Sequence, residues 1–191
     1  MTGTCLAPEL PGAYSMPHNP DLISARQNVY ASVGLNVLKY QQLELRLKDL
    51  LGWHQGTYTP ESFEKEMESR LQSRERSTLG LLAGEVFNKV ILPTPEERSA
   101  DGLKEGESGH RFGVSVSLEI HEHWRSRLKA LVEQRNHLVH GSLLDWDLDT
   151  PEGCQTILIQ LDEQRGRIQT ELKQLETFSD SIQKCLQVSI P

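Results

Sequence analysis

One short segment of the chain carries residue types that could do chemistry together: Arg135-Asn136-His137-Leu138-Val139-His140-Gly141. An arginine can neutralise phosphate charge, a side-chain amide can orient a phosphate, and a histidine can hold or give a proton near neutral pH. His140 falls in the last turn of an expected helix, where unpaired carbonyl groups favour the imidazolium form. Together these groups are the minimum set for RNA cleavage without a metal ion, in which the ribose 2′-hydroxyl is the nucleophile.

Arg135 also has a purely structural interpretation. On a helical wheel it falls in the middle of an apolar arc, whose members are Trp124, Leu128, Leu131, Val132, Leu138 and Val139. Burying an unpaired guanidinium is costly, so Arg135 either pairs with an acid across the bundle or faces an interface that an anion can reach. The candidate acids are Glu44, Asp162 and Glu163, and the wheel alone favours such an ion pair.

The remaining histidines give weaker signals. His121-Glu122-His123 looks like a metal pair, but residues two apart on a helix point in nearly opposite directions, so exposed helix polarity is the better interpretation. His137 and His140 could share a face and ligate zinc or nickel, yet no third ligand stands at a matching spacing nearby. Phosphate-loop, dinucleotide-binding, zinc-protease and nucleophile-elbow motifs are also missing from the sequence. We therefore expect no metal site and no cofactor.

Composition narrows the function further. The chain has 191 residues, as expected for one domain, and 37% of them are hydrophobic, which is enough for a core without disulfides. A net charge of −7 and only 6% aromatic residues argue against a broad nucleic-acid surface, so any RNA contact must be local. The three cysteines, Cys5, Cys154 and Cys185, are widely spaced and indicate reduced cytosolic thiols. Without a leader or a membrane-length apolar run, the expected location is cytoplasmic.

The first half of the chain is expected to form helices that position this segment. Residues 1–20 contain four prolines and are interpreted as a disordered N-terminal arm, followed by a helical domain over residues 21–191. The first helix should begin near Asp21 or Ser24 and stop at Gly52. Thr59-Pro60-Glu61 is a good start for the next helix. The helical pattern that follows predicts either one kinked helix or two consecutive helices. Residues 93–113 are expected to be a flexible loop.

The second half contains the motif helix and one more. Residues 112–120 alternate apolar and polar side chains, but with no second strand candidate to pair with, we expect an extended lead-in to a helix starting near Ser117 or Glu119. That helix should end at Gly141, a natural left-handed stop. Thr150-Pro151-Glu152 then opens the last helix, whose seam calls for a partner helix: Leu158, Leu161, Arg165, Ile168, Leu172, Leu175, Ser179, Ile182 and Leu186. The expected fold is all-α, an up-and-down bundle of four or five helices, one of which packs across a dimer interface.

The motif segment resembles the HEPN superfamily of all-helical proteins. Its signature is an arginine, four to six intervening residues and a histidine, usually with a polar residue directly after the arginine, and Arg135, Asn136 and His140 match it. The stretch 118–175 is also similar to uncharacterised bacterial members that read R-N-x-L-V-H and then L-D-E-Q-R, here Leu161-Asp162-Glu163-Gln164-Arg165. The first half of the chain is similar only in its helical pattern.

The resemblance implies a homodimer in which two motifs face each other and line one composite cleft. Many members are metal-independent endoribonucleases that act as toxins or in phage defence, and others are non-catalytic adaptors or helper subunits. Carried over to this chain, Arg135 would bind and polarise the scissile phosphate, His140 would act as general acid or base, and Asn136 would orient the phosphate or the histidine. His137 would be a bystander.

Two hypotheses follow from the residues and the resemblance together. The first is a ribonuclease of this type, acting on RNA such as tRNA, with an antitoxin or other partner protein. The second is a non-catalytic helical dimer that serves as an adaptor or binds RNA, a nucleotide or a protein. The acidic net charge favours the second hypothesis, whereas the intact Arg135, Asn136 and His140 set favours the first.

Overall fold

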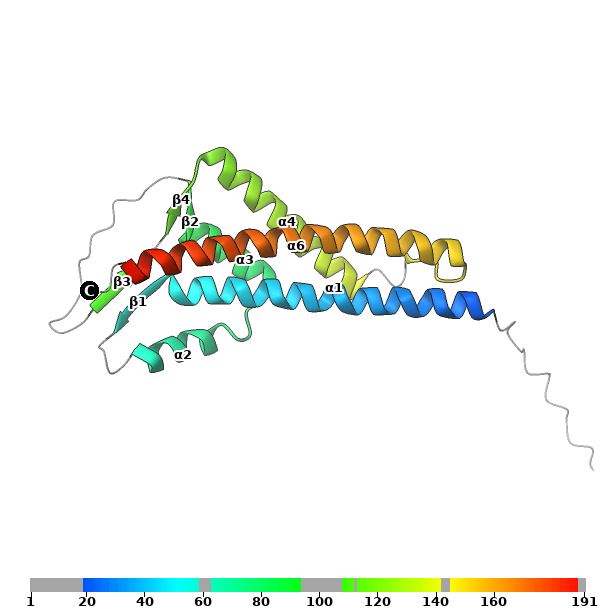
Figure 1. Ribbon diagram of the computed structural model, residues 1–191, viewed down its shortest axis with the longest axis horizontal. Helices are drawn as coiled ribbons and strands as arrows, with labels where there is room; N and C mark the ends of the chain where they lie inside the picture. The colour runs from blue at the N-terminus through cyan, green and yellow to red at the C-terminus, as the bar shows by residue number, and fades with distance from the viewer. Residues whose placement is uncertain (1–18, 59–62, 94–107, 112, 142–144, 189–191) are drawn as a thin grey trace, which may run out of the picture.

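The computed structural model describes residues 19–58, 63–93, 108–111, 113–141 and 145–188 (Figure 1). These residues are mostly helical, which confirms the all-α prediction. The described ranges contain the helices α1 (Pro20–Trp53), α2 (Phe63–Ser73), α3 (Leu79–Lys89), α4 (Leu118–His140) and α6 (Pro151–Val188). They also contain the short strands β1 (Gln55–Tyr58), β2 (Ile91–Leu92), β3 (Ser108–Arg111) and β4 (Val114–Ser115).

The two long helices α1 and α6 run parallel, side by side (Figure 1). Their contact is apolar: Leu43 and Leu47 of α1 and Leu161, Ile168 and Leu175 of α6 are at most 3% exposed. The seam of the last helix therefore finds its partner helix within the same chain. Burial of this seam needs no second copy, so the seam is not evidence for a dimer.

A buried polar network fixes the register of α1 against α6. The Asn36 side chain is fully buried, and its Nδ2 donates to the backbone oxygen of Leu161 at 2.9 Å and to Gln164 Oε1 at 2.8 Å. Its Oδ1 accepts from Arg165 Nε at 3.1 Å, and Arg165 also donates to the Ser32 hydroxyl. Because each polar group is satisfied, the network costs little to bury. The run 161–165, which contributes to the resemblance, has a structural task here.

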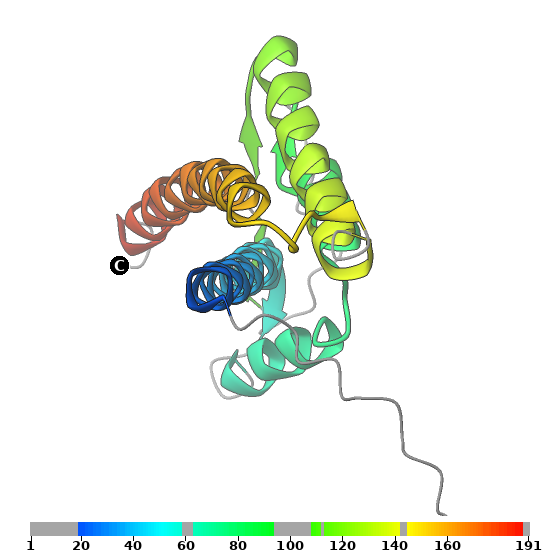
Figure 2. The same ribbon diagram turned by 90° about the vertical axis from the view of Figure 1, so that its right-hand side faces the viewer.

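Helix α4 packs against α3 on one side and α6 on the other (Figure 2). The Trp124 ring meets Phe87 of α3 and Phe178 of α6 edge-on, with ring centroids 5.8 and 6.1 Å away. The Trp124 indole Nε1 donates to Oε2 of the buried Glu171 at 2.7 Å, and Arg127 Nε lies 2.7 Å from Oε1 of the same carboxylate. These polar contacts tie α4 to α6 through one carboxylate.

The boundaries of the first helix differ from the prediction. Helix α1 begins at Pro20 because the Asn19 side chain accepts from the backbone N–H groups of Asp21 and Leu22, at 3.1 and 3.4 Å. Neither Asp21 nor Ser24 is therefore the cap. The prediction of a stop at Gly52 is also wrong, since α1 continues to Trp53 and Gly52 is itself buried in the last turn.

The second helical stretch consists of two helices, α2 and α3, separated by residues 74–78, which is one of the two predicted alternatives. The predicted start at Thr59-Pro60-Glu61 overlaps residues 59–62, which lie outside the described residues, as do residues 1–18 of the predicted arm. Helix α4 has the predicted cap: the Ser117 hydroxyl accepts from the Ile120 backbone N–H at 3.3 Å. The last helix begins at Pro151, as predicted.

The strands are the main departure from the predicted fold. Val114 and Ser115 of β4 pair in parallel with Ile91 and Leu92 of β2, so the lead-in to α4 does have a strand partner. The partner was hidden because Ile91 continues the apolar spacing of the preceding helix. Strand β3 pairs with β1 in antiparallel register, so residues 108–111 of the predicted loop 93–113 are ordered. Residues 94–107 of that loop are outside the described ranges.

Candidate functional site

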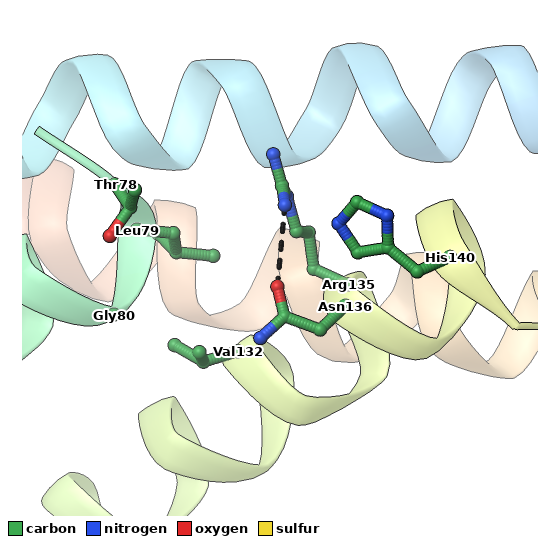
Figure 3. A pocket seen from close by; sticks show the side chains of 7 residues that line it. All are labelled: Thr78, Leu79, Gly80, Val132, Arg135, Asn136 and His140. Atoms are coloured by element: carbon green, nitrogen blue, oxygen red, sulfur yellow. Dashed lines mark hydrogen bonds between the residues drawn. The ribbon is translucent and has the colours of Figure 1, made fainter. Parts of the chain in front are cut away.

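The predicted site residues Arg135, Asn136 and His140 line one open pocket of about 390 Å³. They come from the last two turns of α4, and the first turn of α3 forms the opposite wall (Figure 3). The α3 wall consists of Thr78, Leu79 and Gly80, and Val132 of α4 completes the lining. Asn136 and His140 are exposed and Arg135 is half-buried, so a ligand can reach all three side chains.

The Arg135 guanidinium lies between the start of α3 and the His140 ring (Figure 3). Its Nη1 donates to Asn136 Oδ1 at 3.3 Å, and within the described part of the chain it makes no ion pair. The ion pair that the helical wheel favoured is therefore not formed. Two of the candidate acids serve other arginines on α6: Asp162 lies 3.1 Å from Arg165, and Glu163 lies 3.4 Å from Arg167.

The start of α3 is uncapped by any side chain. Thr78 occupies the cap position without a side-chain hydrogen bond, and the first intrahelical bond runs from Leu82 N–H to Thr78 O at 3.0 Å. The backbone N–H groups before Leu82 have no partner within the helix, and they carry the positive end of the helix dipole. At Gly80 a Cβ atom would lie 3.3 Å from Val132 Cγ1, so glycine lets α3 and α4 approach closely.

His140 is the last residue of α4, and its ring lines the pocket beside Arg135 (Figure 3). His137, one turn earlier, lines a separate pocket with residues that include Trp146 and Asp147, so it stands apart from the set as predicted. Gly141 follows α4, but its φ of −129° contradicts the predicted left-handed stop. Glycine fits there for a different reason: a Cβ atom would lie 3.0 Å from Nδ1 of His137.

Other residues of α4 lie outside this pocket. Val139, placed on the apolar arc, is 46% exposed. Arg125 is exposed, whereas the Arg127 guanidinium is held by Glu171 and Gln174 on the α6 side of the helix. An RNA contact through Arg127 is therefore not available without breaking that ion pair.

The interpretation of His121 as exposed polarity is wrong. Its side chain is 4% exposed, its ring packs edge-on against Phe87, and its Nε2 lies 3.3 Å from the Phe87 backbone oxygen. The apolar environment of the α3–α4 contact explains its burial, since one ring nitrogen reaches a carbonyl there. His123 on the same turn is exposed.

The part of the chain that the structure describes contains no cluster of three or more metal-ligating side chains. Nor does any helix in the described ranges combine the length and apolar character that a membrane crossing requires.

Sequence reasoning missed the contribution of α3 to the pocket. Thr78 and Gly80 lie more than fifty residues before the motif, and no spacing rule connects them to Arg135. The one available signal was local: a threonine directly before the apolar run of residues 79–83 is a typical cap residue. That signal predicts a helix start but not its neighbour in space.

No protein family, curated protein or solved structure matches the chain.

Proposed function

We propose that this protein is a metal-independent endoribonuclease of the HEPN type. The observation that carries the proposal is the convergence of Arg135, Asn136 and His140 on one open pocket with the uncapped first turn of α3. Each of these groups favours an anionic ligand, and the pocket contains no carboxylate that would compete for the guanidinium. A phosphodiester combines negative charge with a leaving group that needs a proton, which suits this set.

The proposed reaction begins with a phosphodiester in the pocket, gripped by the planar Arg135 guanidinium and the N–H groups at the start of α3. The ribose 2′-hydroxyl attacks phosphorus, and its proton passes to a general base. The bond from phosphorus to the 5′-oxygen breaks, and that oxygen takes up a proton, leaving a 2′,3′-cyclic phosphate and a 5′-hydroxyl. His140 performs one of these proton transfers, and Asn136 orients Arg135 through the 3.3 Å hydrogen bond between them.

The resemblance adds an assembly and a setting to the proposal. The helices would form an up-and-down bundle of the HEPN kind, and two copies would place their motifs across one composite cleft. A second His140 would then be available for the other proton transfer. The proposed setting is a cytoplasmic toxin or phage-defence component that cleaves RNA, tRNA being the first candidate, with an antitoxin or other protein as its partner.

The second candidate is a non-catalytic helical dimer that binds RNA, a nucleotide or a partner protein. The acidic net charge of −7 favours it, because phosphate neutralisation would rest on very few side chains. The pocket could bind a phosphate-bearing ligand without any proton transfer by His140.

The deciding experiment incubates purified protein with total tRNA in EDTA and compares it with an Arg135→Ala/His140→Ala variant. We expect the wild-type chain to cleave RNA despite chelation and the double variant to be inactive. His123→Ala is the matched control, because His123 is exposed on the same helix but lies outside the pocket, and it should retain full activity. RNA binding without cleavage by the wild-type chain would favour the second candidate.

A further inference from the structure

The turn that leads from α2 into α3 is basic, although the protein is acidic. Residues 70–84 contain three arginines and one acid, Glu75, whereas acids outnumber lysines and arginines 27 to 20 in the whole chain. The turn covers residues 74–78 and ends at Thr78, which lines the pocket of Arg135. Figure 2 shows this connection reaching α3 beside the C-terminal end of α4. The basic side chains of the turn therefore belong to the surroundings of the proposed cleavage site.

Arg76 is the arginine of this turn whose charge is available to a ligand. Its side chain is exposed, and within the described residues it makes no ion pair, not even with the adjacent Glu75. Arg74, in contrast, is half-buried and donates from Nη1 to the Arg70 backbone oxygen at 3.4 Å, which holds it against α2. A phosphate near the turn would thus meet the Arg76 guanidinium first.

An unpaired arginine is unusual on the helices of this protein. All four arginines of α1 and α6 lie within 3.4 Å of a carboxylate: Arg26, Arg46, Arg165 and Arg167. On α4 the unpaired arginines are Arg125 and Arg135. Arg125 is ten residues from Arg135, about 15 Å along the helix. Arg76 and Arg135 are therefore the available guanidinium groups nearest to the pocket.

Hydrogen bonds at Glu75 fix the position of Arg76 in the turn. The Glu75 N–H donates to the Gln72 backbone oxygen at 3.0 Å, and the Glu75 backbone oxygen accepts from Lys48 Nζ of α1 at 2.9 Å. The Lys48 ammonium adds a second positive charge beside the turn. The Cα atom of Arg76 is two residues from that of Thr78, at most about 7 Å away. A long side chain at this position can reach a ligand that extends out of the pocket past Thr78.

The opposite side of the pocket repels a polyanion. Beyond the end of α4, residues 141–164 contain no lysine or arginine. Asp145, Asp147 and Glu152 are exposed there and line the neighbouring pocket with His137. Like charges at such distances disfavour the passage of phosphates. An RNA strand that enters the pocket is thus directed toward the turn between α2 and α3.

We propose that Arg76 binds the RNA phosphate that flanks the scissile phosphate, a proposal that rests on the proposed ribonuclease function. The strand passes from Arg135 across the start of α3 to the turn. Arg76 holds the flanking phosphate there, while Arg135 and His140 act on the scissile one. The substrate is then an RNA strand with at least two phosphodiesters. Arg76 is a substrate-binding residue that touches no reacting atom.

RNA binding tests this contact without cleavage. In a His140→Ala background, fluorescence anisotropy with labelled single-stranded oligouridine gives the affinity between about 50 and 200 mM salt. We expect Arg76→Ala to weaken binding about fivefold and to reduce the slope of log K against log salt by about 0.7, the effect of one phosphate contact on a single strand. Arg76→Lys should keep the slope, because a point charge suffices. Arg125→Ala is the matched control, since it removes an exposed, unpaired arginine away from the pocket, and it should change neither quantity.

Substrate length separates phosphate binding from support of the fold. A dinucleoside monophosphate contains only the scissile phosphate, so Arg76→Ala should cleave it at the wild-type rate. For oligouridine the same variant should lose about fivefold in kcat/KM, mainly through a higher KM. Equal losses on both substrates would overturn the proposal, because Arg76 would then act on the pocket itself.

The two measurements also distinguish this proposal from the proposed function. If the wild type cleaves RNA but the salt slope is the same in Arg76→Ala, the contact of Arg76 is refuted and the ribonuclease stands. If the wild type does not cleave but its salt slope depends on Arg76, the ribonuclease is refuted and the contact stands. Absence of RNA binding by the wild type would overturn both.

Discussion

Two arginines of α4, Arg127 and Arg135, lie two turns apart and have opposite surroundings. Arg127 faces α6, where Glu171 lies 2.7 Å from its Nε and Gln174 accepts from its Nη2. Arg135 faces the start of α3, and its side chain donates a hydrogen bond to the neighbouring Asn136. The first guanidinium is neutralised and holds two helices together, whereas the second keeps its charge available to a ligand. An arginine on an apolar face therefore becomes structural or functional according to whether an acid lies opposite.

The largest effect should come from His140→Ala. Removal of a general acid or base costs at least 100-fold in rate, and His140 is exposed, so the free energy of unfolding should change by less than about 0.5 kcal/mol. Single-turnover cleavage of tRNA and urea denaturation measure the two quantities. If stability is lost together with activity, His140 supports the fold as Arg127 does. The contrast between the α4–α6 contact at Arg127 and the pocket at Arg135 would then disappear.

The Arg127 side of the comparison is tested by Glu171→Ala. This change leaves the buried Trp124 indole without its acceptor and Arg127 without its carboxylate, so the free energy of unfolding should fall by roughly 3 kcal/mol. Glu163→Ala on the same helix removes an exposed ion pair of 3.4 Å with Arg167 and should cost less than about 0.5 kcal/mol in urea denaturation. Equal losses in the two variants would mean that the buried contact adds nothing.

The Arg135 side is tested by Arg135→Lys. Lysine keeps the charge but loses the planar fork that grips two phosphate oxygens, so cleavage should slow at least tenfold, about 1.4 kcal/mol, with the fold intact. Arg125→Lys is the matched control, because Arg125 is exposed on α4 outside the pocket. Full activity of Arg135→Lys would leave only the charge of Arg135 in the mechanism.

The sequence predicted the helices well because each carries its own periodic apolar face and a start or stop signal. The starts of α4 and α6 are two examples, at Ser117 and Pro151. It failed for the strand pairing: residues 112–120 show the period of two that is typical of a strand, but their partner β2 continues the apolar spacing of the preceding helix and carries no strand pattern of its own.

For the site, local sequence placed Arg135, Asn136 and His140 on one helix end, and the pocket brings these three together. It could not show whether an acid faces Arg135, because a helical wheel gives the direction of a side chain and not the residue on the neighbouring helix. The same limitation hid the burial of His121 and the α3 wall at Thr78. Partner identity across a bundle is set by tertiary packing.

A third carboxyl, Asp49 on α1, sharpens the comparison with the smallest expected effect. Burial raises the pKa of Asp49 above 3.8, and nearby Arg46 offsets this only in part. The Arg46 guanidinium is also engaged by Glu176 at 3.1 Å. Asp49 therefore shares its arginine with a second acid, Glu176, whereas Glu171 is the acid paired with Arg127.

The sign of the effect follows from the raised pKa. Well below pH 3.8 Asp49 is protonated in both the folded and unfolded states, so its ionisation does not influence stability. As the pH rises through 3.8 toward the higher folded pKa, the unfolded state ionises first and folding becomes less favourable. Asp49→Asn removes this loss, so its Tm should exceed that of the wild type at neutral pH and converge with it in acid. A lower Tm at neutral pH would show that the Asp49 carboxylate stabilises the fold through Arg46, as Glu171 does through Arg127.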